Sequence, residues 1–162
     1  MQAQESMRST GSAESPVSIV IPCRAEYVGL CRLLAGVVGG RNAMDAEQIA
    51  DLKLVVTEAC TCFLSESECD ATEDSSDRVH PPPDSLRVDL SMGPEGWEVT
   101  VADSESRHQL SEDSKCLTLD SGNLGLTIMR ALVDKVEHTV GENGGSVIRL
   151  SKGMGPRVKD QP

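Results

Sequence analysis

Residues 55–64 read VVTEACTCFL, and they decide the fold because a helical apolar pattern stands there beside a carboxylate and a thiol. The apolar side chains recur three and four positions apart, as on the buried face of an α-helix. They are Val55, Val56, Ala59, Cys60, Phe63 and Leu64. Glu58 and Cys62 are four residues apart and therefore lie one turn apart beside this stripe. The stretch predicts a core helix that carries polar chemistry along its flank.

Two helices are predicted in the first half of the chain. The helix that contains residues 55–64 is expected to begin at Asp45, because Gln48 follows three residues later as in a capping box. An earlier helix is predicted at residues 25–38, with Arg32 outside its core stripe. That expected stripe consists of Tyr27, Leu30, Leu33, Leu34 and Val37.

Alternating apolar residues predict the strands. VSIVIPC at residues 17–23 reads as a strand, and LRVDLSM and WEVTVAD read as a hairpin across GPEG. A third helix is expected at residues 123–136, followed by a hairpin of VEHTV and SVIRLSK. This order predicts an α+β fold, a two-layer α/β sandwich whose mostly antiparallel sheet is covered on one face by about three helices.

The length of 162 residues predicts one domain with one core. We expect that domain at residues 17–152, between a disordered N-terminus at 1–16 and a flexible tail at 153–162. Residues 65–84 are acidic, end in three prolines and predict a linker, whereas the polar segment 104–122 predicts a lid-like loop.

Composition excludes several function classes. A formal net charge of −11 disfavours nucleic acid, since binding its backbone depends on Lys and Arg contacts to phosphates. No apolar stretch is long enough for a membrane span, and the start has no signal-peptide pattern, so we expect a cytoplasmic protein. In that compartment the six cysteines are expected to be reduced thiols without a disulfide framework.

Four motifs stand in a recognisable order, namely EYVG…RLLAG, DLKLVVTEACT, VTVAD and GLTIMRALVDKVE. With them the chain resembles, over nearly all of residues 17–152, the anti-sigma factor serine kinases of the RsbW type in the GHKL superfamily. The resemblance implies a histidine-kinase-like (Bergerat) ATPase fold that uses ATP and magnesium. It also implies a bacterial stress-response regulator of transcription that sequesters a sigma factor, phosphorylates a STAS-type anti-anti-sigma partner and forms a homodimer.

By this resemblance Glu58 is the general base and Asp103 contacts the adenine amino group. Cys62 stands where the family has an Asn that helps to hold magnesium, and a soft thiol is a poor ligand for that hard ion. We therefore expect no metal ligand at Cys62. Glu105 replaces a family glycine and adds bulk and negative charge beside a polyphosphate, which predicts weakened nucleotide binding.

The Gly-rich run SGNLGLTIM resembles the family's lid end. Gly122 and Gly125 would serve as hinges, and Leu124 and Thr127 belong to the same nucleotide-binding run. Arg32 matches an arginine of the family's sigma-binding surface. The plain structural alternatives are an exposed helix acid for Glu58, a turn for Asp103, a helix entry for the two glycines and a solvated side chain for Arg32.

Three functions remain open. The first is an anti-sigma factor with weakened or lost ATP use, which the two altered motifs favour. The second is an active ATP-dependent serine kinase of the anti-anti-sigma partner, with Glu58 accepting the hydroxyl proton. The third is a cytosolic thiol-based sensor that uses Cys60 or Cys62, which requires a thiol of lowered pKa.

Overall fold

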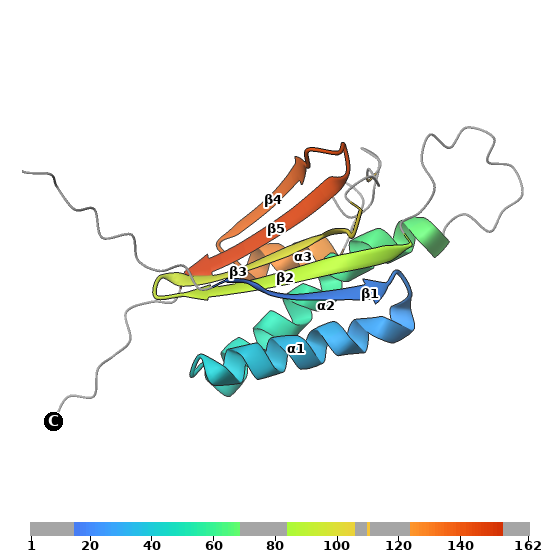
Figure 1. Cartoon of the computed structure of the whole chain (residues 1–162). Coiled ribbons are helices and arrows are strands. Elements are labelled where there is room, and N and C mark those ends of the chain that lie inside the picture. Colours follow the sequence, from blue (N-terminus) through green and yellow to red (C-terminus); the bar gives the residue numbers. More distant parts are fainter. Residues whose placement is uncertain (1–14, 69–83, 106–109, 111–123, 154–162) are drawn as a thin grey trace, which may run out of the picture.

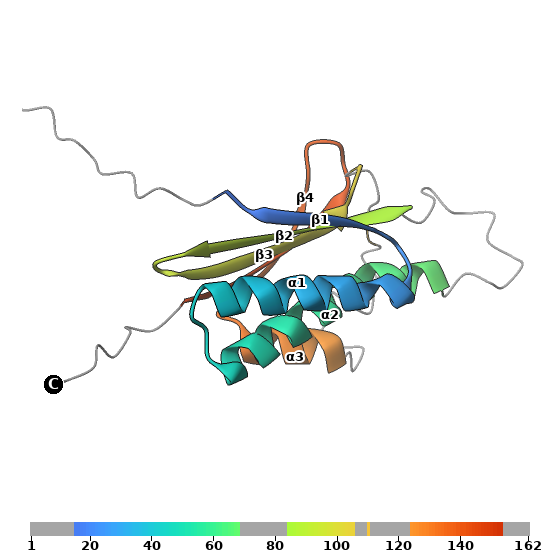
Figure 2. The same ribbon diagram turned by 60° about the horizontal axis from the view of Figure 1, so that its bottom comes forward.

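The architecture is one sheet with helices on one of its faces. The computed structural model describes residues 15–68, 84–105, 110 and 124–153. Within these residues three helices lie against a five-stranded antiparallel sheet (Figures 1 and 2). The predicted α+β two-layer sandwich is therefore confirmed.

The sheet has the strand order β1-β2-β3-β5-β4, so β1 and β4 form its edges. Every neighbouring pair of strands runs antiparallel. The elements are β1 (Val17–Pro22), the 3-10 turn η1 (Ala25–Tyr27), α1 (Val28–Arg41), α2 (Ala46–Glu68), β2 (Ser85–Gly93), β3 (Gly96–Asp103), α3 (Leu124–Leu132), β4 (Lys135–Val140) and β5 (Ser146–Gly153).

The helix α2 lies at the centre of the helical layer, where it packs against both α1 and α3 (Figure 2). The predicted apolar stripe of residues 55–64 is wholly within the core: Leu64 is 6% exposed and the other five residues are 0% exposed. Removing each large apolar side chain from water contributes about 1.5–3 kcal/mol. The burial of α2 is therefore a main source of stability.

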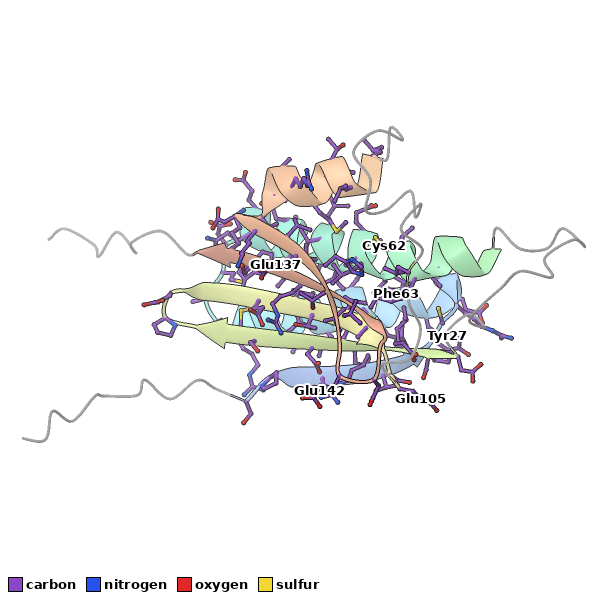
Figure 3. The ribbon with its side chains drawn as sticks, turned by 90° about the horizontal axis from the view of Figure 1, so that it is seen from above. Tyr27, Cys62, Phe63, Glu105, Glu137 and Glu142 are labelled. Carbon is purple, nitrogen blue, oxygen red and sulfur yellow. The ribbon has the colours of Figure 1, made fainter. Side chains whose placement is uncertain are left out.

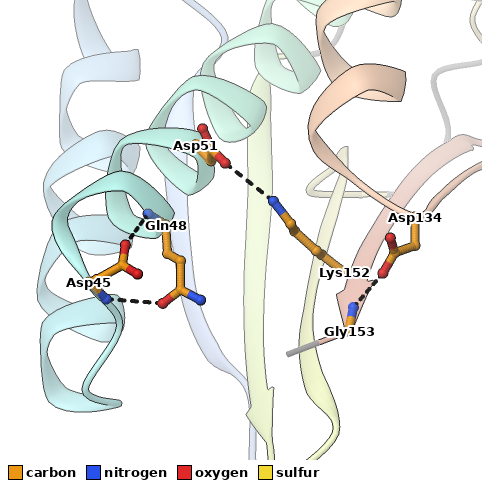
Figure 4. A network of polar contacts seen from close by, with 6 residues as sticks. All are labelled: Asp45, Gln48, Asp51, Asp134, Lys152 and Gly153. Atoms are coloured by element: carbon orange, nitrogen blue, oxygen red, sulfur yellow. Dashed lines mark hydrogen bonds and ion pairs between the residues drawn. The ribbon is translucent and has the colours of Figure 1, made fainter. Parts of the chain in front are cut away.

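A capping box begins α2, as predicted (Figure 4). The Gln48 backbone N–H donates to Asp45 Oδ1 at 2.8 Å, and the Asp45 N–H donates to Gln48 Oε1 at 3.0 Å. The same figure shows Lys152 of β5 joined to Asp51 of α2 by an ion pair of 3.2 Å. The first turns of α2 are thus fixed both locally and to the sheet.

The central hairpin places its apolar residues as expected. Leu86, Val88, Leu90, Trp97, Val99 and Val101 are all buried. Gly96 follows the turn with φ +154°, and a Cβ there would lie 2.2 Å from the backbone oxygen of Lys152. Glycine is needed at this position because β5 passes so close to it.

The predicted core stripe of α1 is wrong at Leu30, Leu33 and Val37, whereas Tyr27 and Leu34 do pack against the core. Leu33 is 66% exposed, Val37 60% and Leu30 45%, while Tyr27 and Leu34 are only partly buried. The buried residues are Val28, Cys31, Ala35, Val38 and Gly39. Small side chains let α1 approach α2 closely: a Cβ on Gly39 would lie 3.0 Å from Ile49 Cγ1. Apolar residues lie on nearly all sides of α1, and the side with the smallest residues is the one that packs against α2.

The third helix is shorter than predicted, because α3 ends at Leu132 and residues 135–136 belong to β4. The Val133 N–H still donates to the Met129 carbonyl at 3.0 Å, but the Asp134 N–H donates to the Ser151 carbonyl of β5 at 3.0 Å. Pairing with β5 therefore replaces the helical hydrogen bonds from Asp134 onward.

Several predicted segments fall wholly or largely outside the described residues, namely the N-terminus, the linker, the lid-like loop and the tail. The helix α2 extends to Glu68, four residues into the predicted linker. Leu110 of the predicted lid-like loop is described and is 2% exposed. Its N–H donates to the Oγ of the buried Ser146 at 2.9 Å, which ties this residue to β5.

None of the helices in the described part of the chain is long and apolar enough to cross a membrane.

Replacing Asp45 tests the capping box. In Asp45→Ala the Gln48 N–H loses its acceptor, so we expect the free energy of unfolding to fall by about 1 kcal/mol in urea denaturation. Asp45→Asn keeps a side-chain oxygen at the cap and should remain close to the unaltered protein. Equal stability of Asp45→Ala and the unaltered protein would contradict the assigned cap.

Candidate nucleotide site

The flank of α2 carries the first two predicted site residues. Glu58 is half-buried, and its carboxylate has no hydrogen-bond or ion-pair partner in the described part of the chain. Cys62, one turn later, is 0% exposed (Figure 3). The carboxylate is thus available to a ligand, whereas the sulfur lies inside the core.

The third predicted residue, Asp103, ends β3 and is only 6% exposed. Its Oδ1 accepts the Glu105 backbone N–H at 3.0 Å, which closes a tight turn. The next residue is held as well, because the Ser104 N–H donates to the Ser85 carbonyl at 3.0 Å. The Glu105 side chain is exposed just beyond the end of β3 (Figure 3). The carboxyl group of Asp103 is therefore fixed at the rim of the sheet.

The predicted Gly-rich run is only partly described. Gly122 lies outside the described residues, and α3 begins at Leu124, which is 70% exposed. Gly125 is buried and Thr127 is exposed. Because α2 contacts both α3 and β3, the three motifs lie on adjoining elements. Among the described residues no hydrogen bond joins Glu58 to Asp103 or to α3.

Comparisons with known proteins agree with this arrangement. Residues 21–152 match the family model described as the histidine kinase-like ATPase domain. The chain belongs to the histidine kinase-like ATPase family.

Curated relatives in this family are similar along most of their length. The serine-protein kinase RsbW of Bacillus pumilus (strain SAFR-032) is 30% identical over 146 residues, which cover 84% of each chain. The serine-protein kinase RsbW of Bacillus subtilis (strain 168) is 29% identical over 153 residues, which cover 88% of each chain. This chain is therefore a distant homologue of RsbW.

A solved structure supports the fold. The crystal structure of the RsbU and RsbW domains of a Mycobacterium tuberculosis protein matches with a TM-score of 0.56 at 18% identity. The match covers 85% of this chain and 32% of that longer chain. At this identity the likeness shows a common architecture of sheet and helices.

A histidine kinase-like ATPase domain can bind ATP together with magnesium. Magnesium prefers oxygen ligands in octahedral geometry. Cys62 is disulfide-bonded and offers no thiolate, and the described residues contain no cluster of three or more His, Cys, Asp or Glu side chains able to hold a metal ion. Cys62 therefore offers no oxygen ligand for magnesium at the position of the family's Asn.

The cysteines differ from expectation. Cys62 is disulfide-bonded, so the prediction of six reduced thiols is wrong at this position, whereas Cys23, Cys31 and Cys60 form no disulfide. A hydrogen bond between the Cys31 and Cys60 thiols lowers the pKa of Cys31 and, together with burial, raises the pKa of Cys60 well above its usual range. Cys60 is thus a poor nucleophile.

One surface feature is not predicted by the sequence pattern. Leu30, Leu33 and Val37 lie three and four residues apart and form an exposed apolar stripe on α1, hereafter the α1 stripe. Arg32, predicted to contact a partner, is exposed next to it. The signal that could have revealed the stripe is the four-residue spacing of Cys31, Ala35 and Gly39, which marks the opposite, small face as the packed one.

Alkylation of the folded protein tests these assignments. At neutral pH the raised pKa keeps Cys60 protonated, and burial blocks access, so iodoacetamide should label the half-buried Cys23 well before Cys60. Cys62 should become labelled only after reduction. Peptide mass spectrometry reads each site, and denaturation should open Cys60 to the reagent. Labelling of Cys60 in the folded protein as fast as Cys23 would contradict this account.

Proposed function

We propose that this protein is an anti-sigma factor: it sequesters an RNA polymerase sigma factor in the cytoplasm and is countered by a STAS-type anti-anti-sigma partner. It does so on a serine-kinase ATPase scaffold whose ATP use is weakened or lost. Homology to RsbW supports the class of function, and the geometry of α1 and α2 supports the emphasis on protein binding.

The observation that carries the proposal is the α1 stripe. Three large apolar side chains, each at least 45% exposed, line one face of a helix whose opposite face is packed. Exposed apolar patches of this kind are typical of protein interaction surfaces. Arg32 stands beside the stripe, and arginine next to apolar anchors is enriched among the residues that dominate binding energy. The surface fits a protein partner.

The second support is the altered nucleotide site. At the position of the family's metal-holding Asn this chain has Cys62, which is buried and disulfide-bonded. Phosphoryl transfer depends on metal ions that neutralise charge on the phosphates. Glu105, at an expected glycine position, adds another negative charge where phosphates would approach. The residues Cys62 and Glu105 therefore favour a protein that binds its partner over one that transfers a phosphoryl group to it.

One observation favours the alternative, an active serine kinase. Glu58 remains a half-buried carboxylate without a partner among the described residues, as a general base requires. The base would accept the proton of the attacking serine hydroxyl. A thiol-based sensor has less support, because Cys60 has a raised pKa and Cys62 has no free thiol.

A homodimer forms part of the same proposal. β1 is an edge strand, and its outer edge pairs with no other described strand. Val17 and Val20 on this strand are 44% and 57% exposed, with no charged residue between them. Unprotected apolar edges are templates for pairing with another chain. A second copy along β1 would cover this edge.

Sigma capture tests the proposed function. The purified protein would be immobilised and presented in turn with each sigma factor of the source bacterium. We expect one of them to bind, and we expect Leu33→Asp and Arg32→Ala each to weaken its binding about tenfold or more, because they place a charge in the apolar contact or remove an anchoring cation.

Val140→Asp is the matched control for this experiment. Val140 is a 56% exposed apolar residue on β4, so the same charge is introduced away from α1. Its binding should equal that of the unaltered protein. If the unaltered protein captures no sigma factor, the proposed function is wrong. If it captures one and all three variants bind equally well, the α1 stripe is not the surface that binds it.

A further inference from the structure

Charge is distributed unevenly between the two layers. Every Lys or Arg on a described strand is neutralised by an acid. These ion pairs are Lys135 with Glu137 at 2.7 Å, Arg87 with Asp89 at 2.9 Å, Lys152 with Asp51 at 3.2 Å and Arg149 with Glu98 at 3.4 Å. The cations on the helices form no ion pair with any described residue, and they are Arg32, Arg41, Lys53 and Arg130.

This imbalance is unexpected in so acidic a chain, in which 26 Asp and Glu stand against 15 Lys and Arg. With acids in such excess, a cation that pairs with none of the described acids is available to an external anion. The helical layer, and not the opposite face of the sheet, therefore presents unneutralised positive charge.

Two of these cations, Arg32 and Lys53, lie near each other where α1 and α2 meet. Lys53 of α2 extends over Gly36 of α1: a Cβ on Gly36 would lie 2.8 Å from Lys53 Cε and 3.2 Å from Nζ. Arg32 is one turn before Gly36, on the same side of α1. The absence of a side chain at residue 36 thus lets the Lys53 ammonium group reach the surface that Arg32 occupies.

We propose that Arg32 and Lys53 together form a carboxylate-recognition site between α1 and α2, which binds acidic side chains of the captured sigma factor. The inference rests on the proposed function. It adds Lys53 to the binding surface and specifies that the partner contributes acidic side chains. Arginine offers a planar fork of donors to a carboxylate, while lysine supplies a compact charge on a flexible stem. An acid placed between them would relieve the repulsion of the two cations and fix the register of the α1 stripe on its partner.

Gly36→Ala is the sharpest variant, because it changes no charge. The added Cβ must displace the flexible end of Lys53, so the ammonium group moves while the fold is retained. Alanine also favours a helix interior over glycine, so the unfolding midpoint should stay constant or rise. Gly40→Ala is the control on the same helix, since a Cβ there meets nothing within 4 Å.

The experiment measures the dissociation constant for the sigma factor that the unaltered protein captures, at low and at high salt. We expect Lys53→Gln and Gly36→Ala each to weaken binding about fivefold at low salt, and the effect of Lys53→Gln to shrink at high salt. Lys135→Gln, which removes a cation already paired with Glu137, and Gly40→Ala should leave binding unchanged.

The outcomes separate the two proposals. If a sigma factor is captured and both Lys53→Gln and Gly36→Ala bind it as the unaltered protein does, the carboxylate site is wrong and the proposed function stands. If Lys135→Gln weakens binding as much as Lys53→Gln, the effect is one of net charge and the site is again overturned. If no sigma factor is captured by the unaltered protein, the proposed function fails and the site fails with it.

Discussion

The burial of α2 is the constraint on which the rest of the structure depends. This helix is packed between α1, α3 and the sheet, and residues from Leu52 to Leu64 supply much of the core. Because its buried face is filled, Glu58 is held on the flank with little freedom. The same packing shields the Cys62 sulfur from solvent. The positions of the inherited site residues therefore follow from the core.

Close contact between α1 and α2 has a second consequence. The contact uses the small residues Cys31, Ala35 and Gly39, which lie on one face of α1. Three larger apolar residues lie on the opposite face, away from α2. Leu30, Leu33 and Val37 are consequently left exposed, and Gly36 leaves room for Lys53 to lie across the helix. One packing choice thus creates both the apolar stripe and the adjoining cations. The surface offered to a partner follows from how the helical layer is built.

Much of this fold could be predicted from the sequence, because an element with apolar residues on only one face can bury only that face. The alternation in β2 and β3 placed six core residues correctly, and the capping box placed the start of α2. The packed face of α1 could not be predicted, since a helix that is apolar all round has no preferred side until α2 is in place.

The end of α3 is set by a contact that is distant in sequence, and the disulfide of Cys62 has no signature in the sequence pattern around it. Asp134 is not helical because its N–H donates to the Ser151 carbonyl instead of to a carbonyl of α3. Ser151 is 17 residues away, so no local pattern predicts this hydrogen bond. The disulfide of Cys62 differs from the reduced state that the expected cytoplasmic compartment predicts. The order of the motifs is sufficient to name Glu58, Asp103 and the start of α3 as candidate site residues, and the contacts of α2 with β3 and α3 place those motifs on adjoining elements.

The most direct test of the central claim, a protein-binding module with an impaired ATP site, is a calorimetric titration with ATP and with ADP, each with and without magnesium. It would be run on the unaltered protein and on Cys62→Asn, which restores an oxygen ligand at the family's metal-holding position. The account predicts no magnesium-dependent binding by the unaltered protein, under oxidising or reducing conditions, and a gain of binding in Cys62→Asn. Tight, magnesium-dependent ATP binding by the unaltered protein would contradict it and would place the active kinase first.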